Sequence, residues 1–139
     1  MASIVYNSAL DDLAKGSIDF DTDTFKIMLV TSSYTPNKDT HTKRSDITNE
    51  VSGTGYTSGG DTTAVTVTKD TANDRLDIDF GNVSWSSATI TARGGVIYKS
   101  RGGLASADEL VAYLDFTSDV TSTNGTFTVD VTSPLRFQN

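Results

Sequence analysis

Cysteine is absent from this sequence of 139 residues. Its absence excludes a thiol nucleophile, a disulfide framework and a thiolate zinc site. Proline is also scarce, with two residues in the chain, so the composition does not match a proline-rich disordered linker. A chain of this length can bury a core of its own without help from a disulfide or a metal. We therefore expect one domain over residues 1–139.

Basic residues are few and scattered. The chain has 11 Lys and Arg against 18 Asp and Glu, which gives a net charge of −7. A nucleic-acid binder needs a basic patch that replaces counterions on phosphate, and only Lys43 and Arg44 are adjacent here, so we expect no nucleic-acid partner. No apolar run approaches the roughly 20 residues of a membrane helix. The N-terminus lacks the basic start and apolar stretch of a secretory signal, so we expect no membrane partner and assembly in a cytoplasm.

Apolar residues recur at helical spacing near the start of the chain. This spacing predicts a helix over residues 3–15, with Ser3 as its N-cap and Gly16 as its stop. Within it, a stripe of Leu10, Leu13 and Ala14 should pack on a sheet.

From Ser17 the period of the pattern changes from helical to two residues. Residues 25–30 are apolar on both faces, which predicts a strand covered on both sides. Residues 31–60 show no periodicity, apart from one possible helical turn at 43–48. Loops this long in a compact domain are uncommon and usually functional, so we interpret 31–60 as an interaction loop.

The second half of the chain alternates apolar and polar residues in short runs. The runs at 65–68 and 75–80 predict a hairpin. The other expected features are a strand region over 83–99 with a bulge at Gly94-Gly95, a loop at 101–108, strands at 110–116 and 127–131 around a turn at Asn124-Gly125, and an edge extension at 135–137. The predicted fold is a single, mainly β domain: an antiparallel, jelly-roll-like β-sandwich with one short N-terminal helix.

Residues that could carry catalysis are isolated in the sequence. His41 is the only histidine, and it lies in a polar loop without a nucleophile motif. Asp77 and Asp79 share one face of a predicted strand, but no aromatic cleft accompanies them. We therefore expect no enzymatic activity, no catalytic residue and no cofactor.

Two further motifs have structural or ligand-binding interpretations. Asp19, Asp21 and Asp23 alternate as in calcium loops, but Thr24 and Val30 stand where an EF-hand needs glycine and glutamate, so only an unusual calcium site stays open. The glycine-rich segment 53–60 does not match a phosphate loop, and we expect its glycines to allow positive φ angles and close contact with another chain. The Thr-x-Thr patterns, as at 89–91 and 126–128, indicate cross-strand threonine pairs.

The order of several long motifs carries a resemblance. The motifs are Met28–Asn37, Asp39–His41, Glu50–Gly60, Val83–Trp85, Ala88–Arg93 and Val96–Tyr98. Together they resemble a family of small virion proteins of tailed bacteriophages, although Gly94-Gly95 is less bulky than that family's pattern. The resemblance implies a capsid decoration, or cement, protein on the outer head surface of the virion. Its expected partners are the major capsid protein and copies of itself, as a trimer or dimer.

Two other roles stay open at this point. One is a neck, tail or fibre-base position in the phage particle, and the other is a glycan-binding or cell-surface-binding module. For any of these roles, rigid aromatic rings and charged side chains near the long loop are candidate contacts. The candidate protein-interface residues are Tyr34, Pro36, Asn37, His41, Arg44, Tyr56 and Arg93. Tyr34 and Tyr56 have the alternative of packing within the monomer.

Overall fold

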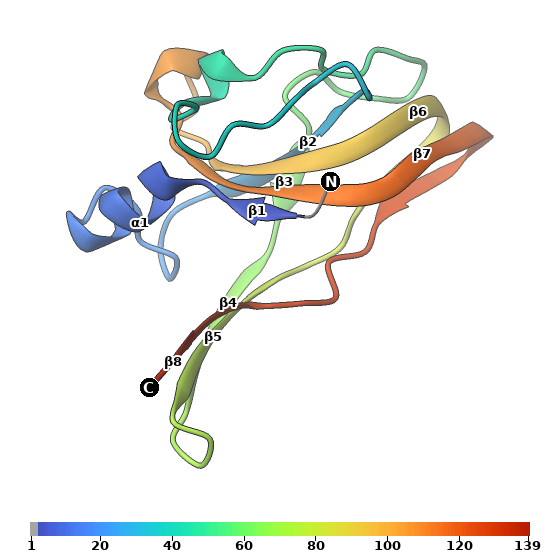
Figure 1. The fold of residues 1–139 in the computed structure, drawn as a ribbon. Helices are drawn as coiled ribbons and strands as arrows, with labels where there is room; N and C mark the ends of the chain where they lie inside the picture. Colours follow the sequence, from blue (N-terminus) through green and yellow to red (C-terminus); the bar gives the residue numbers. More distant parts are fainter. Residues whose placement is uncertain (1–2) are drawn as a thin grey trace.

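The computed structural model describes residues 3–139, which form two antiparallel sheets, one α-helix and long loops (Figure 1). The elements in chain order are β1 (Ile4–Val5), α1 (Asn7–Ala14), β2 (Phe25–Val30), β3 (Asp61–Thr63), β4 (Val65–Asp70), β5 (Arg75–Phe80), β6 (Val83–Lys99), β7 (Leu110–Val129) and β8 (Leu135–Gln138), with 3-10 turns at Arg44–Asp46 and Ala105–Ala107. One sheet has the order β1-β7-β6-β2-β3 and the other has the order β4-β5-β8. The expectation of a mainly β, sandwich-like fold with one short helix is confirmed.

Strand β2 explains why the five-stranded sheet is covered on both faces. Its residues Phe25, Ile27 and Leu29 face the larger core, and Met28 and Val30 belong to a second cluster. The larger core lies on the inner face of the five-stranded sheet, where Ile78 and Phe80 of the second sheet pack against it. The second cluster lies under the long loop of residues 31–60, which runs over the outer face of the five-stranded sheet (Figure 1). The apolar pattern of 25–30 therefore correctly predicted a strand buried on both sides.

Strands β6 and β7 form one long hairpin. They pair from Val83 opposite Val129 to Tyr98 opposite Leu110, with several register shifts on the way. The predicted turn at Asn124-Gly125 is wrong, because Asn124 lies within continuous strand β7. Its φ of 45° places it in the left-handed region, which asparagine tolerates, so the Asn-Gly signal marks an irregularity within the strand rather than a reversal of the chain.

The bulge expected at Gly94-Gly95 is confirmed by a register shift between Ala92 and Gly94. A Cβ atom on Gly94 would lie 2.5 Å from ring atoms of Tyr113. The missing side chain therefore makes room for an aromatic ring from the neighbouring strand.

The N-terminal helix is shorter than predicted. It spans Asn7–Ala14, and Ile4 and Val5 instead pair with Tyr113 and Ala112 at the edge of β7. Pairing with β7, which makes β1 the edge strand of the sheet, outweighs the helical spacing of the apolar residues. The predicted cap by Ser3 is wrong, because its hydroxyl accepts a hydrogen bond from the amide of Asp115.

The predicted stripe on this helix is also only partly correct. Leu13 packs against the larger core, but Leu10 is 48% exposed. Gly16 follows the helix with a φ of 80°, as expected for a stop. None of the helices in residues 3–139 has the length and apolar character needed to span a membrane.

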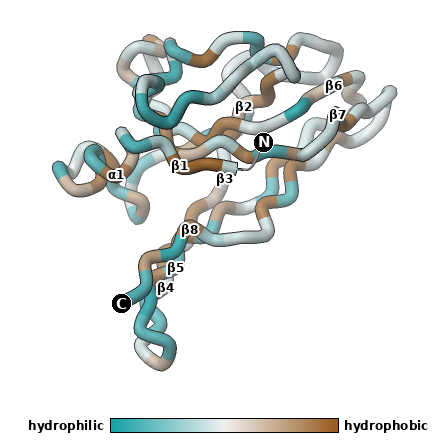
Figure 2. Tube along the Cα trace, in the orientation of Figure 1, coloured by the Kyte–Doolittle hydropathy of each residue, from teal (hydrophilic) through white to brown (hydrophobic). Residues whose placement is uncertain are grey.

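The three-stranded sheet projects from the body of the molecule, and we call it the arm (β4, β5 and β8; Figure 1). The predicted hairpin is confirmed, with Val65 opposite Phe80 and Asp70 opposite Arg75. Residues 135–137 do lie at a sheet edge, but in β8 beside β5, and not as an extension of the strand that ends at Val129. Near the body, Ile78 and Phe80 of the arm are buried, and toward its tip the arm becomes more polar (Figure 2).

Candidate interaction surface

The long loop is fastened to its own sheet through a chain of hydroxyl and imidazole groups. Tyr34 is 4% exposed, and its hydroxyl lies 2.9 Å from that of Tyr6 and 2.8 Å from Nδ1 of His41. The amide of Asn37 donates to the same Nδ1 at 3.3 Å. Since Nδ1 accepts this bond, it carries no proton, and the Tyr34 hydroxyl also donates to it. Burial raises the pKa of Tyr34 and, more strongly, that of Tyr6, so both hydroxyls stay protonated.

Tyr56 fastens the second half of the loop. Its hydroxyl donates to Oε1 of Glu50 at 2.7 Å and accepts from the amide of Leu29 at 3.0 Å. Its ring lies 5.4 Å from that of Trp85, centre to centre. Tyr34 and Tyr56 therefore both pack within the monomer, the alternative given for them above.

The glycine-rich segment 53–60 does adopt positive φ angles, at Gly55, Gly59 and Gly60. The close approach, however, is to this chain and not to another one. A Cβ atom on Gly60 would lie 1.9 Å from the carbonyl oxygen of Ile27, and one on Gly53 would lie 2.4 Å from that of Thr89. Because a side chain at either position would displace a strand, the glycines allow the loop backbone to lie directly against strands β2 and β6.

The two arginines among the candidates are paired within the chain. Nε of Arg44 lies 2.7 Å from Asp108, and its guanidinium lies over the ring of Tyr98. Nε of Arg93 lies 3.2 Å from Asp115. Of the remaining candidates, Asn37 is exposed and Pro36 is half-buried. The structure thus gathers Tyr34, Asn37 and His41 at one place and leaves Arg93 and Tyr56 elsewhere.

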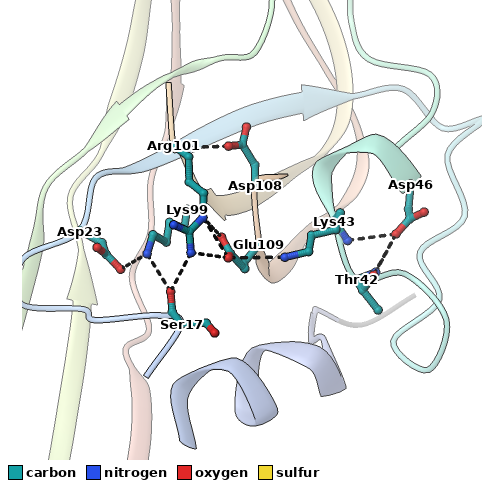
Figure 3. Close-up of polar contacts among 9 residues, drawn as sticks. All are labelled: Ser17, Asp23, Thr42, Lys43, Asp46, Lys99, Arg101, Asp108 and Glu109. Atoms are coloured by element: carbon teal, nitrogen blue, oxygen red, sulfur yellow. Dashed lines mark hydrogen bonds and ion pairs between the residues drawn. The ribbon is translucent and has the colours of Figure 1, made fainter. Parts of the chain in front are cut away.

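A network of ion pairs joins the long loop to the body (Figure 3). At its centre are Asp108 and Glu109, which are 1% and 3% exposed. Arg101 contacts Glu109 at 2.6 Å and Lys43 contacts it at 3.4 Å. Arg44 and Asp108 are 64 residues apart in the sequence, so local patterns could not predict that they pair.

Lys99 extends the same network to the turn that precedes β2. Its Nζ lies 2.7 Å from both Asp23 and the carbonyl oxygen of Ser17 (Figure 3). Three segments therefore meet here: the turn before β2, the long loop, and the connection between β6 and β7. Burial alone would raise the pKa of Glu109, but the hydrogen bonds from Arg101 and the charges of Lys43 and Arg101 hold it below its usual range.

The acidic triplet before β2 is arranged as a turn. Asp23 accepts a hydrogen bond from the amide of Asp19 at 2.8 Å, and Asp19 accepts one from the amide of Asp21 at 2.9 Å. These hydrogen bonds from backbone amides, together with the ion pair between Lys99 and Asp23, give the carboxylates of Asp19 and Asp23 partners within the chain. Within residues 3–139, no three His, Cys, Asp or Glu side chains are grouped so as to hold a metal ion.

The outer face of the β6–β7 hairpin is uncharged and rich in hydroxyl groups over the half farthest from the β6–β7 connection. Residues 83–92 and 120–129 contain no charged residue. Side chains on the inner face, such as Trp85, Ile90 and Phe127, belong to the larger core. On the outer face Ser84 pairs with Thr128 at 2.9 Å, and Thr91 pairs with Thr121 at 3.0 Å. We call Ser84, Ser86, Thr91, Thr121, Thr126 and Thr128 the hydroxyl face.

These contacts confirm the cross-strand pairs expected from the Thr-x-Thr patterns. The sequence also indicates the hydroxyl face, since residues 83–92 and 126–129 each alternate buried apolar residues with exposed Ser and Thr. Only the pairing of the two runs along one hairpin, which the supposed turn at Asn124 obscured, brings them together.

The arm carries a second distinctive surface, which is apolar and partly exposed. A hollow of about 500 Å³ opens between its inner face and the turn before β2. It is lined mostly by apolar side chains, namely Leu13, Ile18, Phe20, Val67, Leu76, Ile78 and Phe137, with Gly16, Asp19 and Asp21 at its edge.

Comparison with known proteins gives no match: no family model, no curated protein and no solved structure is similar to this chain.

Proposed function

We propose that this protein is a non-catalytic structural protein of a tailed-bacteriophage virion, and that it decorates the outer surface of the head. The virion assignment rests on the sequence motifs described above. The observation that supports protein binding is the hydroxyl face, which is exposed and without charge in a chain whose net charge is −7. A partner can approach this face without like-charge repulsion.

The chemistry of the hydroxyl face suits a repeating protein surface. Ser and Thr hydroxyls both donate and accept hydrogen bonds, so the face can adapt to backbone groups of a capsid protein. Each contact is weak on its own. Many copies on one shell gain strength by avidity, and the apolar core beneath the face supplies the rigidity that reinforcement requires.

Addition of purified protein to heads that lack it tests this proposal. Heads are made from the phage that encodes the chain, with its gene removed. We expect the protein to sediment with these heads and to raise the temperature at which they release DNA. No co-sedimentation together with unchanged heat resistance would contradict head decoration, and labelling confined to the neck or tail would favour the alternative position.

A pair of matched variants tests the hydroxyl face itself. Thr121→Arg places a long charged side chain on the face beside Thr91, and we expect it to weaken head binding at least about tenfold. Thr71→Arg makes the same change at the exposed tip of the arm and serves as control. Equal binding of both variants would assign the contact to another surface.

A further inference from the structure

The inner face of the arm is apolar but only half covered. Close to the body, Ile78 and Phe80 are 2% and 7% exposed. Farther out, Val67 and Phe137 are 38% and 37% exposed, although they share the same face. Apolar groups of this size are stabilised when they are removed from water. The outer half of the arm therefore carries surface that a partner would stabilise.

Opposite charges lie at the two ends of this apolar strip. Lys69 is on the same face as Val67, two residues closer to the tip, and it is exposed. Asp19 and Asp21 lie at the other end, at the edge of the hollow. Neither Lys69 nor Asp21 forms an ion pair within residues 3–139.

The arm's other charged pairs point away from the strip. Arg136 contacts Asp77 at 2.6 Å, and Arg75 contacts Asp70 at 3.1 Å, all on the opposite face of the sheet. The arm strands 65–80 and 135–138 hold three basic and four acidic residues, so their net charge is −1, and the rest of the chain carries −6. The strip is thus a nearly neutral part of an acidic molecule.

We propose that the occupant of this strip is the arm of a second copy of the chain, laid across it in the reverse direction about a two-fold axis. A two-fold interface places the same patch on both sides, so a strip with a cation at one end and carboxylates at the other complements itself when reversed. Lys69 of each copy then meets Asp21 of the other, and Val67, Leu76 and Phe137 cover their counterparts. This pairing does not depend on the virion role.

Sedimentation velocity of the full chain tests the pairing without any capsid present. We expect a monomer–dimer equilibrium between about 1 and 100 µM, and a dissociation constant raised at least about tenfold by Lys69→Asp. The double variant Lys69→Asp/Asp21→Lys reverses both charges and should recover most of the affinity. Lys38→Asp makes the same change on the long loop and should have no effect.

Disulfide trapping then identifies the contact, since the chain has no cysteine of its own. Single variants Lys69→Cys and Asp21→Cys are mixed and mildly oxidised, so that a 69–21 disulfide can only join two molecules. We expect a covalent dimer from this mixture, and none when Lys38→Cys replaces Lys69→Cys.

Three results would overturn the proposal. One is a wild-type chain that stays monomeric over the whole concentration range. Another is an oligomer that Lys69→Asp leaves unchanged. The third is a monomeric protein whose head binding is lost with Lys69→Asp, since the arm would then bind the capsid protein instead of a second copy.

Discussion

Gly60 lies where the end of the long loop crosses strand β2. Its φ is 77°, and a Cβ atom would lie 1.9 Å from the carbonyl oxygen of Ile27. Both the backbone angle and the contact therefore require glycine. We expect Gly60→Ala to lower the free energy of unfolding by at least about 2 kcal/mol, because the strand or the loop must move.

Denaturant unfolding followed by the fluorescence of Trp85 measures this loss. Trp85 is the only tryptophan and is 4% exposed, so its emission reports on the larger core. Gly103→Ala is the control, because no atom lies within 4 Å of a Cβ atom there. A similar loss for both variants would mean that the close approach at Gly60 is not the cause.

Glu109 also depends on contacts with other segments of the chain, in this case with basic side chains. Its carboxylate is buried and is held by Arg101 and Lys43. Glu109→Gln keeps the shape but removes the charge, and it leaves the two cations with one partner fewer. We expect a loss of about 2–4 kcal/mol in the free energy of unfolding. Asp119→Asn, on the exposed part of β7, should cost less than about 0.5 kcal/mol.

Helices and strands that are specified by a local sequence pattern could be predicted from the sequence. Strand β2 and the β4–β5 hairpin follow from apolar periodicity, and the stop of α1 follows from Gly16. The errors have one physical origin. Ile4 and Val5 pair with β7, and Asn124 continues strand β7 instead of reversing the chain. Both results depend on partners far along the chain that no local pattern specifies.

The candidate site was predictable only in part, for the same reason. Tyr34, Asn37 and His41 were three of the seven candidate residues, but the buried ring of Tyr34 depends on Tyr6 and Tyr113 from other parts of the chain. Asp108 was assigned to the loop at 101–108, and neither Asp108 nor Glu109 was assigned to a site. Their buried charges are compensated by Lys43 and Arg44 from the long loop and by Arg101 from the β6–β7 connection, two segments that lie far apart in the sequence.

The long loop is an element whose attachment can be tested directly. Tyr34→Phe keeps the ring in place and removes the hydroxyl that joins Tyr6 to His41. We expect a loss of about 1 kcal/mol, because both neighbours lose a hydrogen-bond partner. Amide exchange of residues 31–42 should become faster than in the wild type, while the β6–β7 strands exchange as before.

The contrasting variant is Thr35→Ala, which changes the next residue, an exposed one. It should leave the exchange of residues 31–42 unchanged. Faster exchange throughout the sheet in Tyr34→Phe would show that the loop and the body unfold as one unit, contrary to the expected local opening.

At the scale of the whole molecule, the network around Glu109 joins the layers of the fold. It holds the turn before β2, the long loop and the β6–β7 connection together (Figure 3). Other carboxyls also have lowered pKa values, in Asp46 through hydrogen bonds from the amides of Thr42 and Lys43, and in Asp77 through Arg136. Asp12 differs, because burial raises its pKa. The lowered values outnumber the raised one, so acid should destabilise the protein.

The sign of this effect can be stated for Glu109. Its pKa in the folded chain is below that in the unfolded chain, so the unfolded state binds the proton more readily. The stabilisation is complete above the unfolded value of about 4.3 and is lost as the pH falls through the folded value. We expect the denaturation midpoint to be steady near neutral pH and to fall below about pH 4.5. In Glu109→Gln the fall should be shallower, whereas Asp119→Asn should follow the wild type, and equal slopes in all three proteins would show that the buried network does not govern acid unfolding.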